Sequence, residues 1–367
     1  MNETAIDPRF VHRERQPGLD LLRALAIVIV VIYHAGLFGF ALPYDLHRFG
    51  WIGVDLFFVL SGYLIGGQLL TSLARKGDIQ FGRFYARRAL RILPAYLLVL
   101  AIYFLAPAWR EFPKISPLWK FLLSVQNIDL QGGTAFSHAW SLAVENQFYL
   151  LLPLILIFVR LRRWATVVVP CLVFLGGLGL RAWLASLHPS ATGVSFRGFQ
   201  KWIYYPTWTR LDPLVFGVVL AAIEIYRPSW WRRIINCSPW LWLPGIAAIV
   251  YGLCLGENDL TLATCVWQFP LIAFGMATLL VCGVSSRLPF NQIEVPGAAF
   301  VASIAYSVYL SHKLIIHLVT KLCSSGHIVL TSAPALFFVQ VAIYTGGTLL
   351  FFAVERPFLQ LRRRLTR

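Results

Sequence analysis

The chain has 367 residues, 58% of them hydrophobic and 13% charged. Soluble globular proteins are about 45–50% apolar and about 25% charged, so this composition excludes a soluble fold and a disordered chain, and the lack of a glycine period or a sustained heptad excludes collagen and a coiled coil. The net charge of +16 would indicate nucleic acid binding in a soluble protein. Here the basic residues flank apolar segments, as the positive-inside rule describes, so we expect an integral membrane protein that binds no nucleic acid.

Ten apolar segments are long enough to cross a hydrocarbon core of about 30 Å as helices. In chain order they are 19–40, 51–73, 91–108, 139–159, 165–186, 205–226, 239–256, 262–283, 298–320 and 329–353. The segment 117–127 is apolar but short, so we expect it to lie at the membrane interface. The pattern predicts an all-α polytopic membrane protein with about ten transmembrane helices, surrounded by membrane lipids.

The basic residues also predict the orientation of the chain. With the N-terminus in the cytoplasm, 21 of the 32 Lys and Arg residues fall in cytoplasmic segments and eight in outer segments, so both termini are expected to be cytoplasmic. The first span is too long for the apolar region of a cleavable signal peptide, so we expect it to be retained. This divides the chain into a cytoplasmic segment 1–18, one transmembrane domain 19–358 and a basic cytoplasmic tail 359–367.

The six cysteines form no Cys-x-x-Cys pair, and most lie in or beside apolar segments. The sequence therefore supports neither a zinc site nor a disulfide framework. We predict that the protein holds no metal.

Two ionisable residues lie within the first span. Arg23 and His34 are eleven positions apart, a rotation about 20° beyond three helical turns, so they share one face with roughly 16 Å between them. A charged residue inside the membrane is costly and is a candidate functional residue by default. Arg suits a bidentate grip on phosphate, and a neutral imidazole can accept a proton from a hydroxyl. The alternative is an Arg that reaches the surface and a His that is bonded to a backbone carbonyl.

Two acidic residues are predicted at a similar depth to His34. Asp55 lies near the outer end of the second span, and Glu145 lies in the outer half of the fourth, on the same helical face as Ser141 and Tyr149. Three ionisable groups from three spans at one level indicate a shared site, in which a carboxylate orients the imidazole. The alternative is that each carboxylate pairs with one of the two other cations inside spans, Arg210 and Lys313.

The sequence FYARRALRILPAY places three arginines, Arg87, Arg88 and Arg91, at the cytoplasmic mouth of the third span. Arg88 and Arg91 share a helical face, a spacing that suits a polyanion such as a nucleotide phosphate. The alternative is ordinary positive-inside charge or contact with lipid headgroups.

Six motifs occur in this order along nearly the whole chain: LDLLRALAIVIVVIYH, GWIGVDLFFVLSGYLI, FYARRALRILP, HAWSLAVENQFYLLLP, YSVYLSHKLII and VERPF. With them the sequence resembles the acyltransferase-3 family of bacterial membrane O-acyltransferases. The resemblance implies transfer of an acyl group, usually acetyl, from cytoplasmic acyl-CoA to a hydroxyl of a glycan or glycolipid at the periplasmic side of the bacterial inner membrane. Acetyl-CoA is then a donor substrate, and no cofactor is bound.

The resemblance also implies roles for residues. His34 is the catalytic histidine and Arg23 its paired arginine, which we also place among the residues that bind acyl-CoA. The arginine motif of Arg88 and Arg91, with Arg87 beside it, contacts the CoA phosphates. We add Asp55 and Glu145 as catalytic assistants of His34. Ser141, Tyr149 and Arg210 are our candidates for binding the acceptor, which the sequence leaves open among lipopolysaccharide O-antigen, exopolysaccharide, another glycolipid and a small glycoside.

The sequence departs from the family in two places. Many relatives carry two acidic residues where this chain has Glu145 and Asn146. The chain also ends about a dozen residues after the last predicted span, so we expect the acceptor to be bound by the membrane domain itself or by a partner. A different function, a proton-coupled transporter or exporter of a sugar or lipid, is favoured by the number of spans alone, and an inactive relative that serves as a structural subunit is the third alternative.

Overall fold

The computed structural model describes residues 16–40, 43–161, 164–190, 193–257 and 259–365. Its helices of at least ten residues are α1 (Pro17–Leu37), η2 (Pro43–Ile52), α2 (Gly53–Lys76), α3 (Phe81–Leu105), α5 (Trp140–Leu161), α6 (Ala165–Ser186), α8 (Asp212–Tyr226), α9 (Pro228–Leu255), α10 (Leu262–Val284), α11 (Ala298–Ser325), α12 (Ala333–Leu350) and α13 (Arg356–Leu365). The shorter elements are η3 (Pro107–Trp109), α4 (Leu118–Leu122), η4 (Ser137–Ala139), β1 (Pro189–Ser190), β2 (Gly193–Val194), α7 (Phe196–Gly198), η5 (Phe199–Tyr204), η6 (Thr207–Thr209), η7 (Pro289–Asn291) and η8 (Phe351–Glu355).

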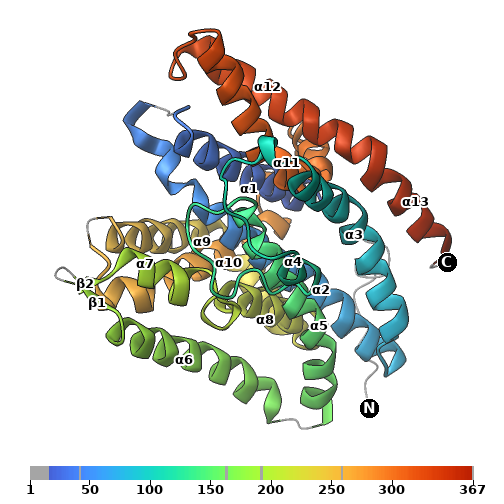
Figure 1. Ribbon diagram of the computed structural model, residues 1–367. Coiled ribbons are helices and arrows are strands. Elements are labelled where there is room, and N and C mark those ends of the chain that lie inside the picture. The colour runs from blue at the N-terminus through green and yellow to red at the C-terminus, as the bar shows by residue number, and fades with distance from the viewer. Residues whose placement is uncertain (1–15, 41–42, 162–163, 191–192, 258, 366–367) are drawn as a thin grey trace. The chain divides into compact units, whose positions relative to one another are not determined.

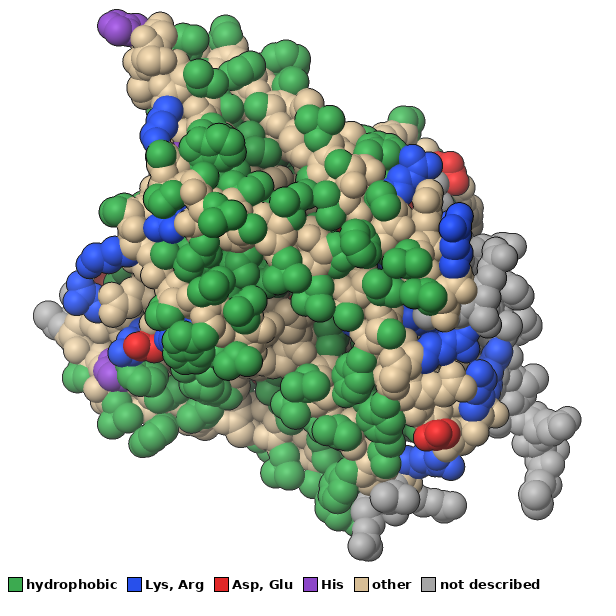
Figure 2. Space-filling model, turned by 45° about the vertical axis from the view of Figure 1, so that its right-hand side comes forward, with side chains coloured by type: hydrophobic (Ala, Val, Ile, Leu, Met, Phe, Trp, Pro, Cys, Tyr) green, Lys and Arg blue, Asp and Glu red, His purple; other side chains and the backbone are tan. Residues whose placement is uncertain are grey.

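In these ranges, nine helices are long and apolar enough to cross a membrane, which confirms an all-α multi-pass membrane protein. Figure 2 shows many apolar side chains exposed on the surface. An apolar surface of this kind matches the lipid hydrocarbon that surrounds a spanning helix.

Four predicted segments differ markedly from the structure in length. One is the predicted span 239–256, because α9 begins at Pro228, eleven residues earlier. The predicted span 205–226 contains the 15-residue helix α8, which begins at Asp212 because Pro213 occupies its first turn, and π and 3-10 turns precede it. Fifteen residues span roughly 22 Å, so α8 is shorter than a typical spanning helix. The helix α3 begins at Phe81, ten residues before the predicted span, so the arginine motif is helical. The segment 117–127 contains only the five-residue helix α4.

The chain forms two compact units, and each is built from separate stretches of sequence. The first unit comprises residues 1–23, 55–79 and 144–299. Here α10 packs against α6, α8 and α9. The close approach of α2 and α8 depends on small residues, because a Cβ at Gly62 would overlap the Leu214 carbonyl, and one at Gly217 would overlap the Val59 carbonyl.

The second unit comprises residues 24–54, 80–143 and 300–367. In it α12 continues through the π-helical turn η8 into α13, which packs against α3 (Figure 1). The segment between α3 and α5 is held by a stack of buried aromatic rings. The Phe136 ring lies 4.4 Å from that of Tyr103 and 5.5 Å from that of Phe121, measured between centroids. This stack fixes the short turn η4, which carries His138.

Candidate functional site

Three histidine rings meet in the second unit. His34 lies near the end of α1, His138 in η4 and His312 in α11. The His312 ring centroid is 4.7 Å from that of His34 and 4.7 Å from that of His138, and the His34 and His138 centroids are 6.2 Å apart. All three contacts are edge to face, an arrangement that aromatic rings favour. We call these residues the histidine cluster.

Each ring of the histidine cluster contacts a backbone carbonyl oxygen through one nitrogen. A carbonyl oxygen only accepts hydrogen bonds, so in a neutral imidazole the proton lies on the nitrogen that faces it, and the other nitrogen keeps its lone pair. This assigns a bare Nε2 to His34, a bare Nδ1 to His138 and a bare Nε2 to His312. The three bonds are His34 Nδ1 to Val30 O at 3.0 Å, His138 Nε2 to Leu310 O at 3.3 Å and His312 Nδ1 to Tyr309 O at 2.7 Å.

The three rings differ in accessibility. His138 is 2% exposed and His312 is 0% exposed, whereas His34 keeps part of its surface accessible. A reacting group can therefore reach His34 more readily than the other two. From the sequence, the backbone bond of His34 was the structural alternative to a catalytic role. In the structure this bond leaves the reactive nitrogen bare, so it is compatible with that role.

The turn that carries His138 is anchored on both sides. Phe136 has a left-handed backbone with φ 56°, and its N–H donates to Glu111 Oε1 at 3.0 Å. The Tyr309 hydroxyl donates to the His138 carbonyl at 2.7 Å and lies 2.6 Å from the hydroxyl of Ser141. The predicted acceptor residue Ser141 thus contacts Tyr309 beside the histidine cluster.

A buried ion pair lies beside the histidine cluster. Lys313 Nζ is 3.1 Å from Glu111 Oε1 and donates to Ser137 Oγ at 3.0 Å. Glu111 was not singled out from the sequence because it lies outside the spans, where carboxylates are common. In the described part of the chain, no group of three His, Cys, Asp or Glu is arranged to hold a metal ion.

The predicted catalytic assistant Asp55 lies in the first unit, in a pair with the predicted acceptor residue Arg210. Arg210 Nη2 donates to Asp55 Oδ1 at 2.9 Å, and both side chains are 0% exposed. The Arg210 guanidinium also lies 3.8 Å from the centroid of the Phe269 ring. A second buried pair joins Arg181 to Asp212 at 2.6 Å. The pairing of Asp55 with Arg210 is the alternative that the sequence left open.

Glu145 and Tyr149 also lie in the first unit, joined through Ser61. Ser61 donates to Glu145, and the Tyr149 hydroxyl donates to Ser61 Oγ at 3.0 Å. Two residues of the predicted face of α5, Glu145 and Tyr149, are therefore linked by hydrogen bonds through Ser61. The hypothesis that Asp55 or Glu145 orients His34 stays a prediction.

The arginines of α3 have neighbours that were not singled out from the sequence. Arg362 of α13 interacts electrostatically with Arg87 and Arg91, and Glu355 interacts with both Arg91 and Arg362. The sequence signal was the basic run Arg362–Arg364, which we assigned only to a cytoplasmic tail. Arginines that gather with few carboxylates suit a polyanionic ligand. On α1, Arg23 is 31% exposed and lies 3.5 Å from Asp20.

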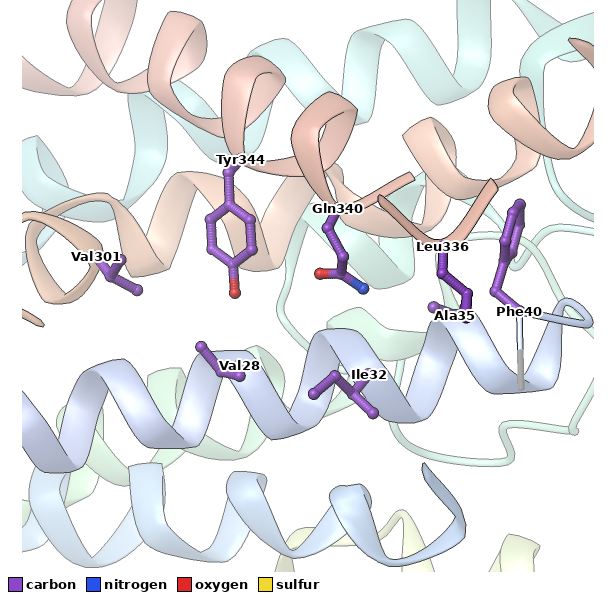
Figure 3. Close-up of a pocket in the computed structure, with 8 residues that line it drawn as sticks. All are labelled: Val28, Ile32, Ala35, Phe40, Val301, Leu336, Gln340 and Tyr344. Carbon is purple, nitrogen blue, oxygen red and sulfur yellow. The ribbon is translucent and has the colours of Figure 1, made fainter. Parts of the chain in front are cut away.

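A pocket of about 480 Å³ lies between α1 and α12 in the second unit (Figure 3). Its lining comprises Val28, Ile32, Ala35, Phe40, Val301, Leu336, Gln340 and Tyr344. Gln340 and Tyr344 point from α12 toward α1. The lining is mostly apolar and contains no base, so the pocket suits an apolar chain rather than the transfer of an acyl group.

Comparisons with known proteins agree with the motifs. A family model described as an acyltransferase domain matches residues 16–354. The peptidoglycan O-acetyltransferase OatA of Listeria monocytogenes is 34% identical over 229 residues, which are 58% of this chain and 34% of that protein. The O-acetyltransferase OatA of Staphylococcus aureus is 29% identical over 349 residues, which are 89% of this chain and 54% of that protein.

The chain thus spans between a third and about half of the length of these curated relatives. No solved structure shows a significant match. The family model covers nearly all of the residues that form the helices described above. The chain therefore belongs to the acyltransferase-3 family.

Proposed function

We propose that this chain transfers an acetyl group from acetyl-CoA, at the cytoplasmic face of the bacterial inner membrane, to a hydroxyl of a glycan on the other side. The observation that carries this proposal is the bare Nε2 of His34, the one partly accessible residue of the histidine cluster. Membership of the family supports acyl transfer as the reaction. The relatives named O-acetyltransferase support acetyl as the group transferred, and the one named for peptidoglycan supports a glycan as the acceptor.

His34 acts as the general base. Its Nε2 takes the proton of the acceptor hydroxyl while that oxygen attacks the thioester carbonyl carbon. A C–O bond forms and the C–S bond breaks. The proton then passes from the imidazole to the departing sulfur, so the products are a glycan ester and free CoA thiol. In the covalent route Nε2 attacks the thioester carbon first, so that the C–S bond breaks and an acyl-imidazole forms. The acceptor hydroxyl then attacks the acyl carbon, the C–N bond breaks, and the hydroxyl proton passes to the thiolate.

The arginines of α3 hold the phosphates of the donor in this scheme. Arg87, Arg88 and Arg91 lie on one helix, and Arg362 of α13 adds a further guanidinium. One guanidinium group can donate two parallel hydrogen bonds to a phosphate, and these charge-assisted bonds are short. The pantetheine arm of CoA is of the same order of length as the separation of roughly 16 Å between Arg23 and His34 along α1.

The experiment that tests the function is a mass-spectrometric comparison of envelope and secreted glycans from cells with and without the chain. Peptidoglycan is the first glycan to analyse, because a relative is named for it. We expect one glycan to gain an acetyl mass increment when the chain is present. Unchanged glycans, together with proton-coupled uptake of a sugar or lipid into vesicles, would establish the transporter alternative instead.

Replacing Arg88 by alanine is expected to raise the apparent KM for acetyl-CoA about tenfold with little change in kcat, because it removes a charge-assisted bond to the donor. The measurement is release of CoA thiol by isolated membranes over a range of acetyl-CoA concentrations. Arg197→Ala is the matched control, since that side chain is exposed in the first unit. An unchanged KM in Arg88→Ala would contradict the phosphate role.

A further inference from the structure

The histidine cluster contains two rings that the proposed mechanism does not use. His138 and His312 are 2% and 0% exposed, and neither side chain is explained by packing alone, because each presents a buried polar nitrogen. Among the described residues, His138 Nδ1 and His312 Nε2 have no hydrogen-bond partner. A buried acceptor without a donor costs about 1–3 kcal/mol, so two such atoms together need a reason.

The protons of these two rings are fixed by backbone carbonyls. His138 donates to Leu310 O and His312 to Tyr309 O, so both bare nitrogens can only accept a hydrogen bond. The ligand that satisfies them must therefore bring donors. A glycan hydroxyl is such a donor, and both rings lie within 6.2 Å of the His34 ring, measured between centroids.

We propose that His138 and His312 bind the acceptor: their bare nitrogens accept hydrogen bonds from hydroxyls that neighbour the one reacting at His34. This rests on the proposed function and adds to it the residues that recognise the glycan acceptor. The site then selects acceptors with neighbouring hydroxyl groups, such as sugar rings, over alcohols with a single hydroxyl and over water. A site built to bond a substrate hydroxyl discriminates strongly against an analogue that lacks it, because its buried polar groups are then unpaired.

Two substitutions separate this role from a structural one. In His138→Gln the side-chain amide can still donate to the Leu310 carbonyl, and in His312→Asn the amide can still donate to the Tyr309 carbonyl. Both substitutions delete the bare nitrogen. His327→Asn is the matched control, since His327 is exposed and has φ 58°, a conformation that asparagine tolerates.

Each variant is measured in two assays at matched membrane levels. The first is acetylation of the cellular glycan, and the second is release of CoA thiol by isolated membranes with water as the only acceptor. We expect His138→Gln and His312→Asn each to lower glycan acetylation about tenfold or more, while thiol release stays within about twofold. A structural role would lower both in proportion, and the control should change neither.

A measurement on the unchanged protein covers the case in which both variants fail to fold. Membranes with the wild-type chain receive labelled acetyl-CoA and either methyl glucoside or cyclohexanol as a probe acceptor. We expect the sugar to be acetylated at least about tenfold faster than the single alcohol. Equal use of the two probes, or use of neither while thiol is released to water, overturns the proposal.

The outcomes also separate this inference from the proposed function. If the wild-type chain neither releases thiol from acetyl-CoA nor changes any glycan, the proposed function itself fails. If the wild-type chain is active and both variants acetylate the glycan at its level, only the acceptor role of His138 and His312 fails.

Discussion

Replacing His34 by alanine is expected to lower glycan acetylation by about 10²–10⁴-fold, the usual contribution of a general base. The side chain is partly accessible and its ring rests against His312, so its loss should remove the base without opening a large hole in the core. Glycan acetylation and CoA thiol release are compared with wild type at equal membrane levels. His327→Asn again serves as the control histidine.

Thiol release with water as the acceptor distinguishes the role of His34 from the roles of His138 and His312. A base is needed whichever hydroxyl attacks, so His34→Ala should lower thiol release together with glycan acetylation, unlike the substitutions at His138 and His312. Activity at the wild-type level in His34→Ala would refute the catalytic assignment. Mass spectrometry of the chain after a brief reaction with acetyl-CoA separates the two routes, because only the covalent route places an acetyl increment on His34.

Replacing Asp55 by alanine is expected to destabilise the protein by about 3–5 kcal/mol, because it leaves the buried guanidinium of Arg210 without the carboxylate it binds. The double variant Asp55→Leu, Arg210→Met removes both charges and should regain most of this loss, since apolar replacement of a buried pair is often neutral. The stability of the wild type, of Asp55→Ala and of the double variant is measured by thermal unfolding of the purified membrane protein. Glu294→Ala, an exposed acidic position in the first unit, is the control.

A double variant as unstable as Asp55→Ala would contradict a dominant role for the pair in stability. The conservative variant Asp55→Asn addresses the catalytic prediction separately, because its amide oxygen can still accept from Arg210. Loss of acetylation in a stable Asp55→Asn protein would support catalytic assistance by Asp55. Full activity would leave the residue with its pairing role alone.

The sequence by itself determined the class of protein and much of the helical architecture. Spans follow from local composition, because about 20 apolar residues must form a helix to satisfy their backbone in lipid. The exception at 205–226 arises from the same local chemistry, since Pro213 sets the start of α8 after irregular turns. The ordered motifs also gave the family, which the match over residues 16–354 confirms.

The tertiary structure alone decided which polar groups meet. Helical periodicity shows which residues share a face, but it carries no information about which helix or loop that face meets. Lys313 binds Glu111, a residue of a loop, and Asp55 binds Arg210, which is 155 positions away. The meeting of His34 with His138 and His312 depends on the aromatic stack around Phe136, which holds an irregular turn against α11. Buried polar side chains find partners through long-range packing, so the site could be completed only once the chain had folded.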